Sequence, residues 1–186
     1  MILNLGCGKN IMKDCVNVDV TPYKGVNQVV DLSKFPWPWA DESIDGINAS
    51  HLIEHFPYQE VFIYECLRVL KKGGFLRLKL PHCSNVTSAG CMGHYRTYSY
   101  DTFKDYLSRD FYMFKTKRFE TVEQRLRWWY ELTDCQGELP GWMIPIIKAV
   151  DYVLTRLANI SPRVCENLWC YWVGGFREVV WKGIKV

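Results

Sequence analysis

The chain alternates between short apolar runs and polar or glycine-containing turns. Runs of strand length that are rich in Val, Ile and Leu lie at residues 2–5, 16–20, 26–32, 43–50, 75–80 and 176–186. Two other segments, residues 57–72 and 146–158, repeat their apolar residues at the spacing of an amphipathic helix. Strands that alternate with helices in this way predict an α/β fold with a largely parallel sheet.

The predicted helix after the fourth strand has recognisable ends. Pro57 is favoured at the first helical position, and the basic residues Lys71 and Lys72 suit the negative end of the helix dipole. Gly73 and Gly74 follow at once, and glycine is the usual residue in the left-handed conformation that ends a helix. The sequence therefore predicts that the helix stops at this glycine pair and that the fifth strand follows.

The second half of the chain is less regular. Residues 83–93 are small and polar and predict a loop, after which Ser99 can cap a helix over residues 100–109. Residues 111–129 mix aromatic and basic side chains and predict a strand, either bent or folded into a hairpin.

Composition narrows the class of protein. The 186 residues are 48% hydrophobic and 23% charged, which is typical of a folded globular domain and excludes a disordered chain. The net charge of +3 is too small to predict nucleic-acid binding. Aromatic residues make up 15% of the chain, which favours a large apolar site or a partner surface. No uninterrupted apolar run is long enough to cross a bilayer.

The cysteines point to a reducing compartment. Eight are present, but none forms a C-x-x-C pair, so the spacing of a zinc knuckle is missing and no metal site is predicted. The N-terminus shows neither the basic nor the apolar region of a secretory signal. We therefore expect reduced thiols in a cytoplasmic protein.

The first strand ends in a glycine-rich turn that contains Gly6, Cys7 and Gly8. Glycines let the backbone turn tightly and let a ligand approach where a Cβ atom would clash. The second strand ends soon afterwards at Asp19, the place where an open α/β sheet holds both hydroxyl groups of a ribose. Alternatively, Asp19 only caps a turn. The connection between Gly8 and Asp19 has room for one or two helical turns in place of a full crossover helix.

Six sequence blocks, in order, carry a resemblance to a known family. The blocks are Asn4–Gly8, Val18–Asp19, Val30–Leu32, Ser43–Asp45, His51–His55 and Leu67–Gly74. With this order the chain resembles class I S-adenosylmethionine-dependent methyltransferases, above all the small-molecule, type 11-like branch. The resemblance covers residues 2–82. It implies a Rossmann-like, doubly wound sheet of seven strands, mostly parallel, whose last strand is antiparallel.

The resemblance also implies a division of the chain. We expect a single methyltransferase domain over residues 1–186. Its cofactor-binding half would be residues 1–82. The substrate-side half would be residues 83–186 and would include a helical insertion at about residues 140–174.

S-adenosylmethionine is the cofactor that the resemblance implies, and its methionine part would lie against the glycine-rich turn. Gly6, Cys7 and Gly8 would pass beneath it. Asn4 stands where many members of the family carry an acid that helps to hold the amino group of the cofactor. We therefore count Asn4 among the predicted cofactor-binding residues.

The adenosine part would be held by residues after the second and third strands. Asp19, with Val20 beside it, would bind the ribose hydroxyl groups. Asp31 would accept a hydrogen bond from the adenine amino group, and Leu32 would lie beside the ring.

Transfer of a sulfonium methyl group needs alignment, a dry site and the removal of a proton from some acceptors. The resemblance places Ser50 and His51 where the sulfonium meets the acceptor, and His51 is a catalytic candidate that would orient the substrate. His94 is the other candidate, as an acceptor contact or general base; alternatively, it ties its loop to the sheet. We expect His55 and His82 to make structural hydrogen bonds.

The resemblance thus implies an enzyme that transfers a methyl group to an oxygen or nitrogen atom of a small molecule, and a similarity to sugar-pathway methyltransferases favours a saccharide. The expected partners are this acceptor and a second copy of the chain in a homodimer. A nicotinamide-dependent oxidoreductase is excluded because Ile11 occupies the third glycine position and Asp19 follows too soon. The alternative is a non-catalytic cofactor-binding or scaffold subunit with the same fold.

Overall fold

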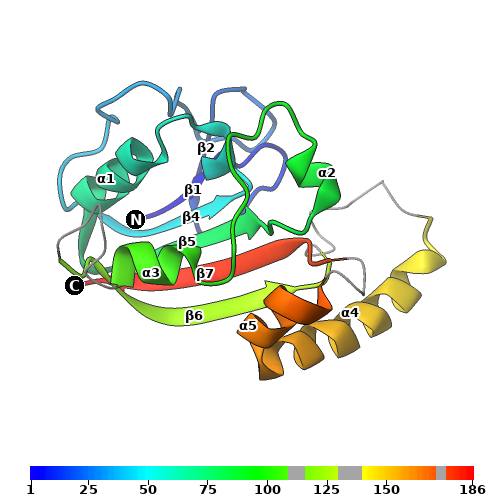
Figure 1. Cartoon of the computed structure of the whole chain (residues 1–186). Helices are drawn as coiled ribbons and strands as arrows, with labels where there is room; N and C mark the ends of the chain where they lie inside the picture. Colours follow the sequence, from blue (N-terminus) through cyan, green and yellow to red (C-terminus); the bar gives the residue numbers. More distant parts are fainter. Residues whose placement is uncertain (109–115, 130–139, 171–174) are drawn as a thin grey trace.

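The computed structural model describes residues 1–108, 116–129, 140–170 and 175–186. A seven-stranded sheet in the order β3-β2-β1-β4-β5-β7-β6 runs through its centre (Figure 1). The strands are β1 (Ile2–Leu5), β2 (Val16–Asp19), β3 (Gln28–Val29), β4 (Ile44–Ser50), β5 (Leu70–Pro81), β6 (Phe119–Arg127) and β7 (Glu178–Lys185).

The strand directions confirm the predicted sheet. Strands β1 to β5 pair in parallel, and β7 runs antiparallel to both β5 and β6. The strand order reverses at β1, which has β2 on one side and β4 on the other. Open α/β sheets bind ligands at such a switch point, beyond the carboxyl ends of the strands. Gly6, Asp19 and Ser50 lie at this edge of the sheet.

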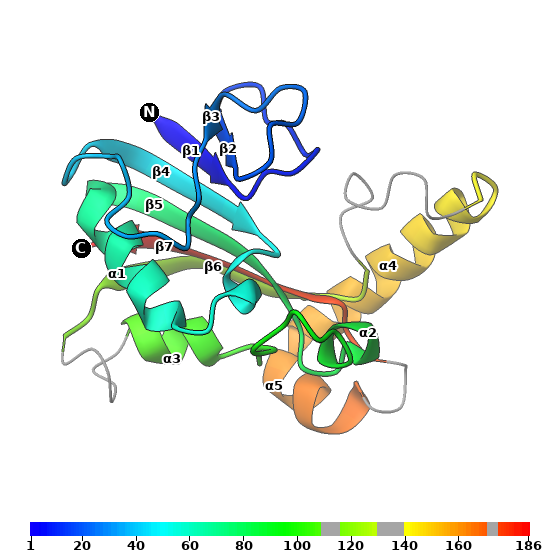
Figure 2. The same ribbon diagram turned by 90° about the horizontal axis from the view of Figure 1, so that it is seen from above.

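Helices cover one face of the sheet and one of its ends. α1 and α3 lie on the same face, whereas α2, α4 and α5 gather where β5 and β6 end (Figures 1 and 2). The helical elements are η1 (Ile53–His55), α1 (Gln59–Val69), α2 (Val86–Ala89), α3 (Thr102–Ser108), α4 (Met143–Ile160), α5 (Pro162–Val164) and the π-helical turn η2 (Cys165–Trp169).

The core lies between the sheet and α1. Leu3, Ile47 and Leu76 are register neighbours on β1, β4 and β5, and all three are fully buried. Phe62 of α1 and Trp181 of β7 belong to the same cluster. Each such side chain contributes about 1.5–3 kcal/mol of burial free energy. This packing holds the strands, and hence the ligand edge of the sheet, in place.

An aromatic loop over residues 35–39 covers part of the same face. Trp37 and Trp39 are both buried, and the Trp37 ring packs edge-on against Phe62 with 5.2 Å between the ring centroids. The backbone N–H of Trp37 donates a hydrogen bond to Glu65 of α1 at 2.8 Å. The loop therefore takes the place that a helix after β3 would occupy.

The predicted glycine stop of the helix after β4 is wrong. α1 ends at Val69, and β5 begins at the next residue. The last carbonyls of the helix already have partners: the N–H of Ser43 bonds to the Val69 oxygen at 2.9 Å, and the ammonium group of Lys185 bonds to the Leu67 oxygen at 3.0 Å. Because of these bonds no left-handed residue is needed, and Gly73 (φ +77°) lies inside β5.

Two other predictions needed correction. The third strand, expected over residues 26–32, is only two residues long, because this edge strand has β2 as its one neighbour. The expected loop at residues 83–93 contains the short helix α2, and the Asn85 side chain caps its N-terminus.

The end of the chain follows the prediction more closely. The helix expected over residues 100–109 is α3, and β6 accounts for part of the strand expected over residues 111–129. Residues 109–115 and 171–174 lie outside the described part of the chain. None of the helices in the described ranges combines the length and apolar character that crossing a bilayer needs.

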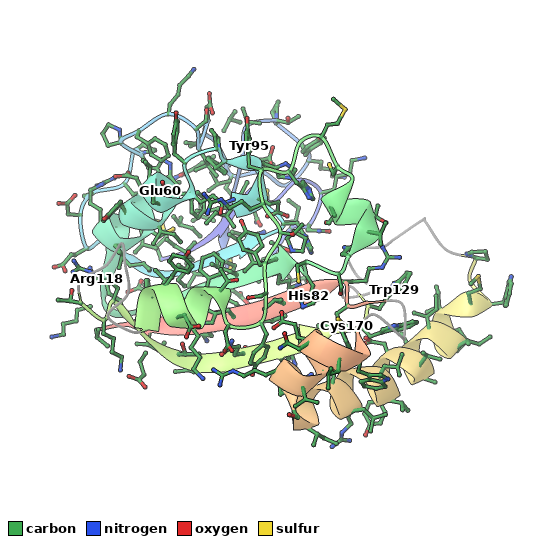
Figure 3. The ribbon with its side chains drawn as sticks, viewed as in Figure 1. Glu60, His82, Tyr95, Arg118, Trp129 and Cys170 are labelled. Atoms are coloured by element: carbon green, nitrogen blue, oxygen red, sulfur yellow. The ribbon has the colours of Figure 1, made fainter. Side chains whose placement is uncertain are left out.

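α4 packs its inner face against the end of β6. Asp151 accepts a hydrogen bond from the N–H of Trp129 at 3.0 Å and forms an ion pair with Arg127 at 3.3 Å. The Asn159 amide bonds to the N–H and carbonyl of Leu126 at 3.0 and 2.8 Å. Trp129 marks this junction in Figure 3. The helical insertion is thus attached to the sheet by polar contacts along one side of α4.

Candidate active site

Both glycines of the turn after β1 adopt a left-handed conformation. Gly6 has a φ of +59°, and a Cβ atom there would lie 2.6 Å from Cδ1 of Leu52. Gly8 has a φ of +51°, and no atom lies within 4 Å of the place its Cβ would take. The first glycine therefore allows close packing with the chain after β4, whereas the second leaves open space for a ligand.

Cys7 lies between the two glycines and is buried. Burial, together with the nearby charge of Asp19, raises the pKa of the Cys7 thiol. A thiol with a raised pKa is a poor nucleophile at neutral pH. Cys7 therefore fits its predicted role as part of the turn beneath the methionine part of the cofactor, and it does not fit a catalytic role.

Asp19 holds this turn in shape from the end of β2. Its Oδ2 accepts the N–H of Gly8 at 2.8 Å, and its Oδ1 accepts the N–H of Thr21 at 2.9 Å. Asp19 thus caps a turn, as the alternative interpretation expected. Each carboxylate oxygen nevertheless keeps a second lone pair. The same residue can therefore accept two hydroxyl groups of a ligand while it holds the turn.

Side-chain amides replace a crossover helix between β1 and β2. Nδ2 of Asn4 donates to the Asn10 carbonyl and to Oδ1 of Asn17, both at 2.8 Å. Nδ2 of Asn17 donates to the Met12 carbonyl at 3.0 Å and to Oδ1 of Asn27 at 3.1 Å. These bonds pair backbone groups of the loop that would otherwise need a helix or water. The sequence interpretation missed this network, although four asparagines near a short connection were its visible signal.

The network makes a specific prediction for Asn4, whose side chain is buried and turned toward the loop. Asn4→Ala should lower the free energy of unfolding by about 2 kcal/mol, because two hydrogen bonds are lost. Asn4→Asp should cost more, because a carboxylate would face the oxygens of Asn10 and Asn17 without a proton to donate. Chemical denaturation of the three proteins measures this order. An aspartate variant as stable as the wild type would contradict the network.

Asp31 follows β3 at the same edge of the sheet. Its Oδ1 accepts the hydroxyl of Ser33 at 2.6 Å and the Ser33 N–H at 3.1 Å, and these bonds lower the pKa of Asp31. The carboxylate is therefore ionised at neutral pH, the state that accepts a hydrogen bond from an amino group. The side chain of Leu32 is buried in the core, and its carbonyl accepts the indole N–H of Trp37 at 3.0 Å.

His51 follows β4 with a φ of +49° and lies between two fully buried carboxylates. Its Nε2 is 3.2 Å from Oε2 of Glu178, and its Nδ1 is 3.4 Å from Oε1 of Glu54. Burial acts to lower the pKa of His51, but the hydrogen bonds and charges of Glu178 and Glu54 outweigh it and raise the pKa to about 9. His51 is therefore an imidazolium at neutral pH and has no lone pair with which to accept a proton.

The sequence interpretation did not assign either carboxylate to His51. Glu54 is three residues further along, and the turn of η1 brings it back to the ring. Glu178 is 127 residues away in sequence and reaches the site because β7 pairs with the end of β5 at Pro81. Of these two contacts, only the one with Glu54 could be expected from the local sequence, because Glu54 follows His51 by three residues.

His94 lies in the loop between α2 and α3, and its ring meets the ring of His55 edge-on, with 4.8 Å between the centroids. Nδ1 of His55 donates to the Gly93 carbonyl at 3.0 Å, so His55 ties this loop down. Nδ1 of His94 is buried and has no hydrogen-bond partner among the described residues. Side-chain atoms of Glu54, His55 and His94 lie within 4.8 Å of one another. The His94 ring, whose buried Nδ1 has no partner among the described residues, thus lies near the Glu54 carboxylate that holds His51.

The groups at this edge fit S-adenosylmethionine. Asp19 and Asp31 offer carboxylates to hydroxyl and amino groups, and the open side of Gly8 admits a ligand. Val20 is exposed next to Asp19. Asn4 is the exception, because both hydrogens of its amide are used within the loop.

Comparison with protein families matches residues 3–78 to the family described as "Methyltransferase domain". No curated protein matches the chain in sequence. The match spans β1 to most of β5, the part that carries the glycine turn, Asp19 and Asp31. It confirms the resemblance to class I methyltransferases over this segment and implies S-adenosylmethionine as the cofactor.

Solved structures extend the similarity of fold to the whole chain. An S-adenosylmethionine-dependent methyltransferase from Archaeoglobus fulgidus is 18% identical, with a TM-score of 0.59 over 99% of this chain and 85% of that one. A Thermotoga maritima methyltransferase, named as a possible histamine N-methyltransferase, is 15% identical, with a TM-score of 0.56 over 100% and 82%. The [4+2]-cyclase SpnF is 15% identical, with a TM-score of 0.54 over 99% and 74%. The predicted fold is thereby confirmed.

Proposed function

We propose that this chain, as an S-adenosylmethionine-dependent methyltransferase, methylates an oxygen or nitrogen atom of a small molecule, with a saccharide as the favoured acceptor. The observation that carries the proposal is the bond from the Gly8 N–H to Asp19, which sets a carboxylate beside an open glycine turn at the switch point of the sheet. In this proposal Asp19 binds the ribose, Asp31 binds the adenine amino group, and the methionine part lies against the turn.

The bound cofactor supplies a methyl group that its positive sulfur already activates. The remaining work of the protein is to orient the acceptor, exclude water and hold a proton. His51 is a positioning residue in this scheme: Glu54 and Glu178 hold its ring, which fixes the chain next to Ser50. In this scheme His94 contacts the acceptor, and its buried Nδ1 has no hydrogen-bond partner among the described residues.

The proposal keeps the predicted division of the chain. Residues 1–82 hold the cofactor, and residues 83–186 supply the acceptor side through the loop that carries His94. A small molecule suits a site closed by this loop, and the net charge of +3 gives no reason to expect nucleic acid. We place the protein in the cytoplasm, because the cysteines in the described ranges are unpaired.

His94→Gln tests the acceptor contact. One lost hydrogen bond should lower kcat/KM about 10-fold, while the affinity for S-adenosylmethionine should stay the same. Tyr95→Phe is the matched control, because the exposed Tyr95 side chain follows His94 in the same loop (Figure 3). If His94 also accepts the proton, the variant loses the acid limb of the pH–rate profile. Equal kcat/KM in both variants would contradict the assignment.

A second function, a cofactor-binding subunit without methyl transfer, has one observation in its favour. Related enzymes carry an acid at the position of Asn4, but the side-chain amide of Asn4 donates both of its hydrogen bonds to the loop between β1 and β2. The neighbour SpnF, a cyclase, illustrates that this fold is not restricted to one reaction. Retained cofactor binding with no turnover of any acceptor would favour this second function.

Calorimetric titration of the purified chain tests the proposal. We expect S-adenosylmethionine and S-adenosylhomocysteine to bind with a Kd of about 10 μM, which corresponds to roughly −7 kcal/mol, and NAD not to bind. A screen of saccharides and small amines with radiolabelled cofactor then identifies the acceptor. Absence of binding by both adenosyl compounds would contradict the proposed function.

A further inference from the structure

The outer face of α4 is apolar and unpartnered in the described chain. Its side chains are between 37% and 79% exposed, although α4 is a regular helix of 18 residues. They are Ile146, Val150, Val153, Leu157 and Ile160. We call this set the α4 stripe. Soluble proteins rarely leave a continuous apolar patch of this kind open to water, so the stripe indicates an interaction surface.

The spacing of the α4 stripe indicates what covers it. Successive members are 4, 3, 4 and 3 residues apart, which is the heptad spacing of a helix that packs along another helix. No charged residue lies on the stripe, and the exposed residues Pro145, Ala149 and Tyr152 of the same helix are uncharged as well. Arg156 instead stacks on the ring of Tyr152, beside the stripe, with 5.0 Å from its guanidinium carbon to the ring centroid. An apolar row at heptad spacing fits a second helix that packs along it.

The described chain has no helix left to fill this role. The inner side of α4 already contacts β6 through Asp151 and Asn159. α5 and η2 follow α4 after Ser161 and lie near its C-terminal end, where the sheet ends (Figures 1 and 2), and Cys165 of η2 belongs to the same buried cluster as Ala158, which is not a member of the stripe. Among the described residues, therefore, no helix covers the stripe, and a helix of another molecule can pack there.

We propose that the α4 stripes of two copies pack antiparallel and form the interface of a homodimer. A twofold axis on the outer side of the helix, at the level of residue 155, sets Val150 against Ile160 of the second copy and Val153 against Leu157, so four layers form from one repeated pattern. Because the stripe is complementary to a second copy of itself, no other protein is needed to cover it.

The area agrees with a dimer. The five exposed side chains, of which the register pairs all but Ile146 with one another, present roughly 500 Å² per copy, or about 1,000 Å² for the pair, which is near the lower limit for a specific interface. Trp142, 70% exposed just before α4, adds to the same side. Interfaces at this lower limit are typical of weak or transient complexes, so we expect a dimer that dissociates in the micromolar range.

A membrane surface is the competing occupant. An interfacial helix has a broad apolar face and a polar face rich in Lys and Arg. The exposed charged residues of α4 are only Lys148 and Arg156 within the described helix, and the acid Asp151 is paired with Arg127. These features favour a second copy.

Sedimentation equilibrium of the full chain between 1 and 200 μM tests the proposal. We expect a monomer–dimer equilibrium that Val153→Arg and Leu157→Arg each shift to monomer by at least 50-fold in Kd. Tyr152→Arg is the matched control, because it adds the same charge to an exposed position of α4 outside the stripe. Circular dichroism and cofactor titration show whether each variant is folded.

Each outcome decides the question. A monomer at 200 μM, or a dimer that the stripe variants leave intact, would overturn the proposal. Flotation with vesicles of phosphatidylcholine and phosphatidylglycerol provides the other test: binding of a monomer that is lost in Leu157→Arg would assign the stripe to a membrane. The dimer and the proposed methyl transfer are measured separately, so either can fail alone.

Discussion

Asp19→Ala is expected to weaken the binding of S-adenosylmethionine about 100-fold. The carboxylate would accept two ribose hydroxyl groups, and it also holds the N–H of Gly8 at 2.8 Å in the turn below the cofactor. Hydrogen bonds to a charged group contribute about 1.5–3 kcal/mol each. A combined loss of about 3 kcal/mol corresponds to roughly a 100-fold change in Kd. Isothermal titration of S-adenosylhomocysteine gives the same comparison without turnover.

The matched control is Asp14→Ala, which removes an exposed carboxylate from the same loop. It should leave the Kd within about twofold. A folded Asp19→Ala variant with wild-type affinity would show that this residue only caps the turn. Asp19→Asn adds a sharper comparison, because the amide oxygen can still accept from Gly8 but the charge is gone. We expect its affinity to lie between those of the wild type and the alanine variant.

The parts of the fold that sequence predicted correctly are the parts with a local cause. β1 and β2 are short runs that end at a glycine or an acid, β4 ends at Ser50, and neighbouring strands in the chain are neighbours or near neighbours in the sheet. The site residues at their ends, Gly8 and Asp19, follow from the same pattern. The contact between them is a consequence of parallel pairing, because β2 brings Asp19 level with the turn.

The errors have non-local causes. The end of α1 was placed at the Gly-Gly pair because glycine is the common local stop. The carbonyls at that end are paired instead by Ser43, from before β4, and by Lys185, from the last strand. Glu178 was missed for the same reason, since only the pairing of β7 with β5 brings it to His51. No residue near these positions in sequence carries that information.

The stability of the folded chain should fall as the pH rises from 6.5 to 8.5. His51 lies between Glu54 and Glu178, and His82 lies 3.0 Å from Glu166 (His82 is labelled in Figure 3). For His82, too, burial acts to lower the pKa, but the Cys83 thiol and the Glu166 carboxylate outweigh it, so that both histidines have a pKa of about 9 against an ordinary 6.5. A raised pKa in the folded state adds stability that is complete below pH 6.5 and is lost as the pH rises through 9.

Proton linkage predicts that the free energy of unfolding falls by about 2 kcal/mol per histidine between pH 6.5 and pH 8.5. Chemical denaturation at several pH values measures this change. Glu178→Gln and Glu166→Gln each remove one partner carboxylate and should each flatten part of the slope. Glu120→Gln is the control, because Glu120 pairs with Lys117 at the opposite end of β6. An imidazole titration by NMR separates the two rings. A His51 pKa near 6.5 would mean that the two buried carboxylates do not hold it as a cation, and the positioning role proposed for His51 would lose its physical basis.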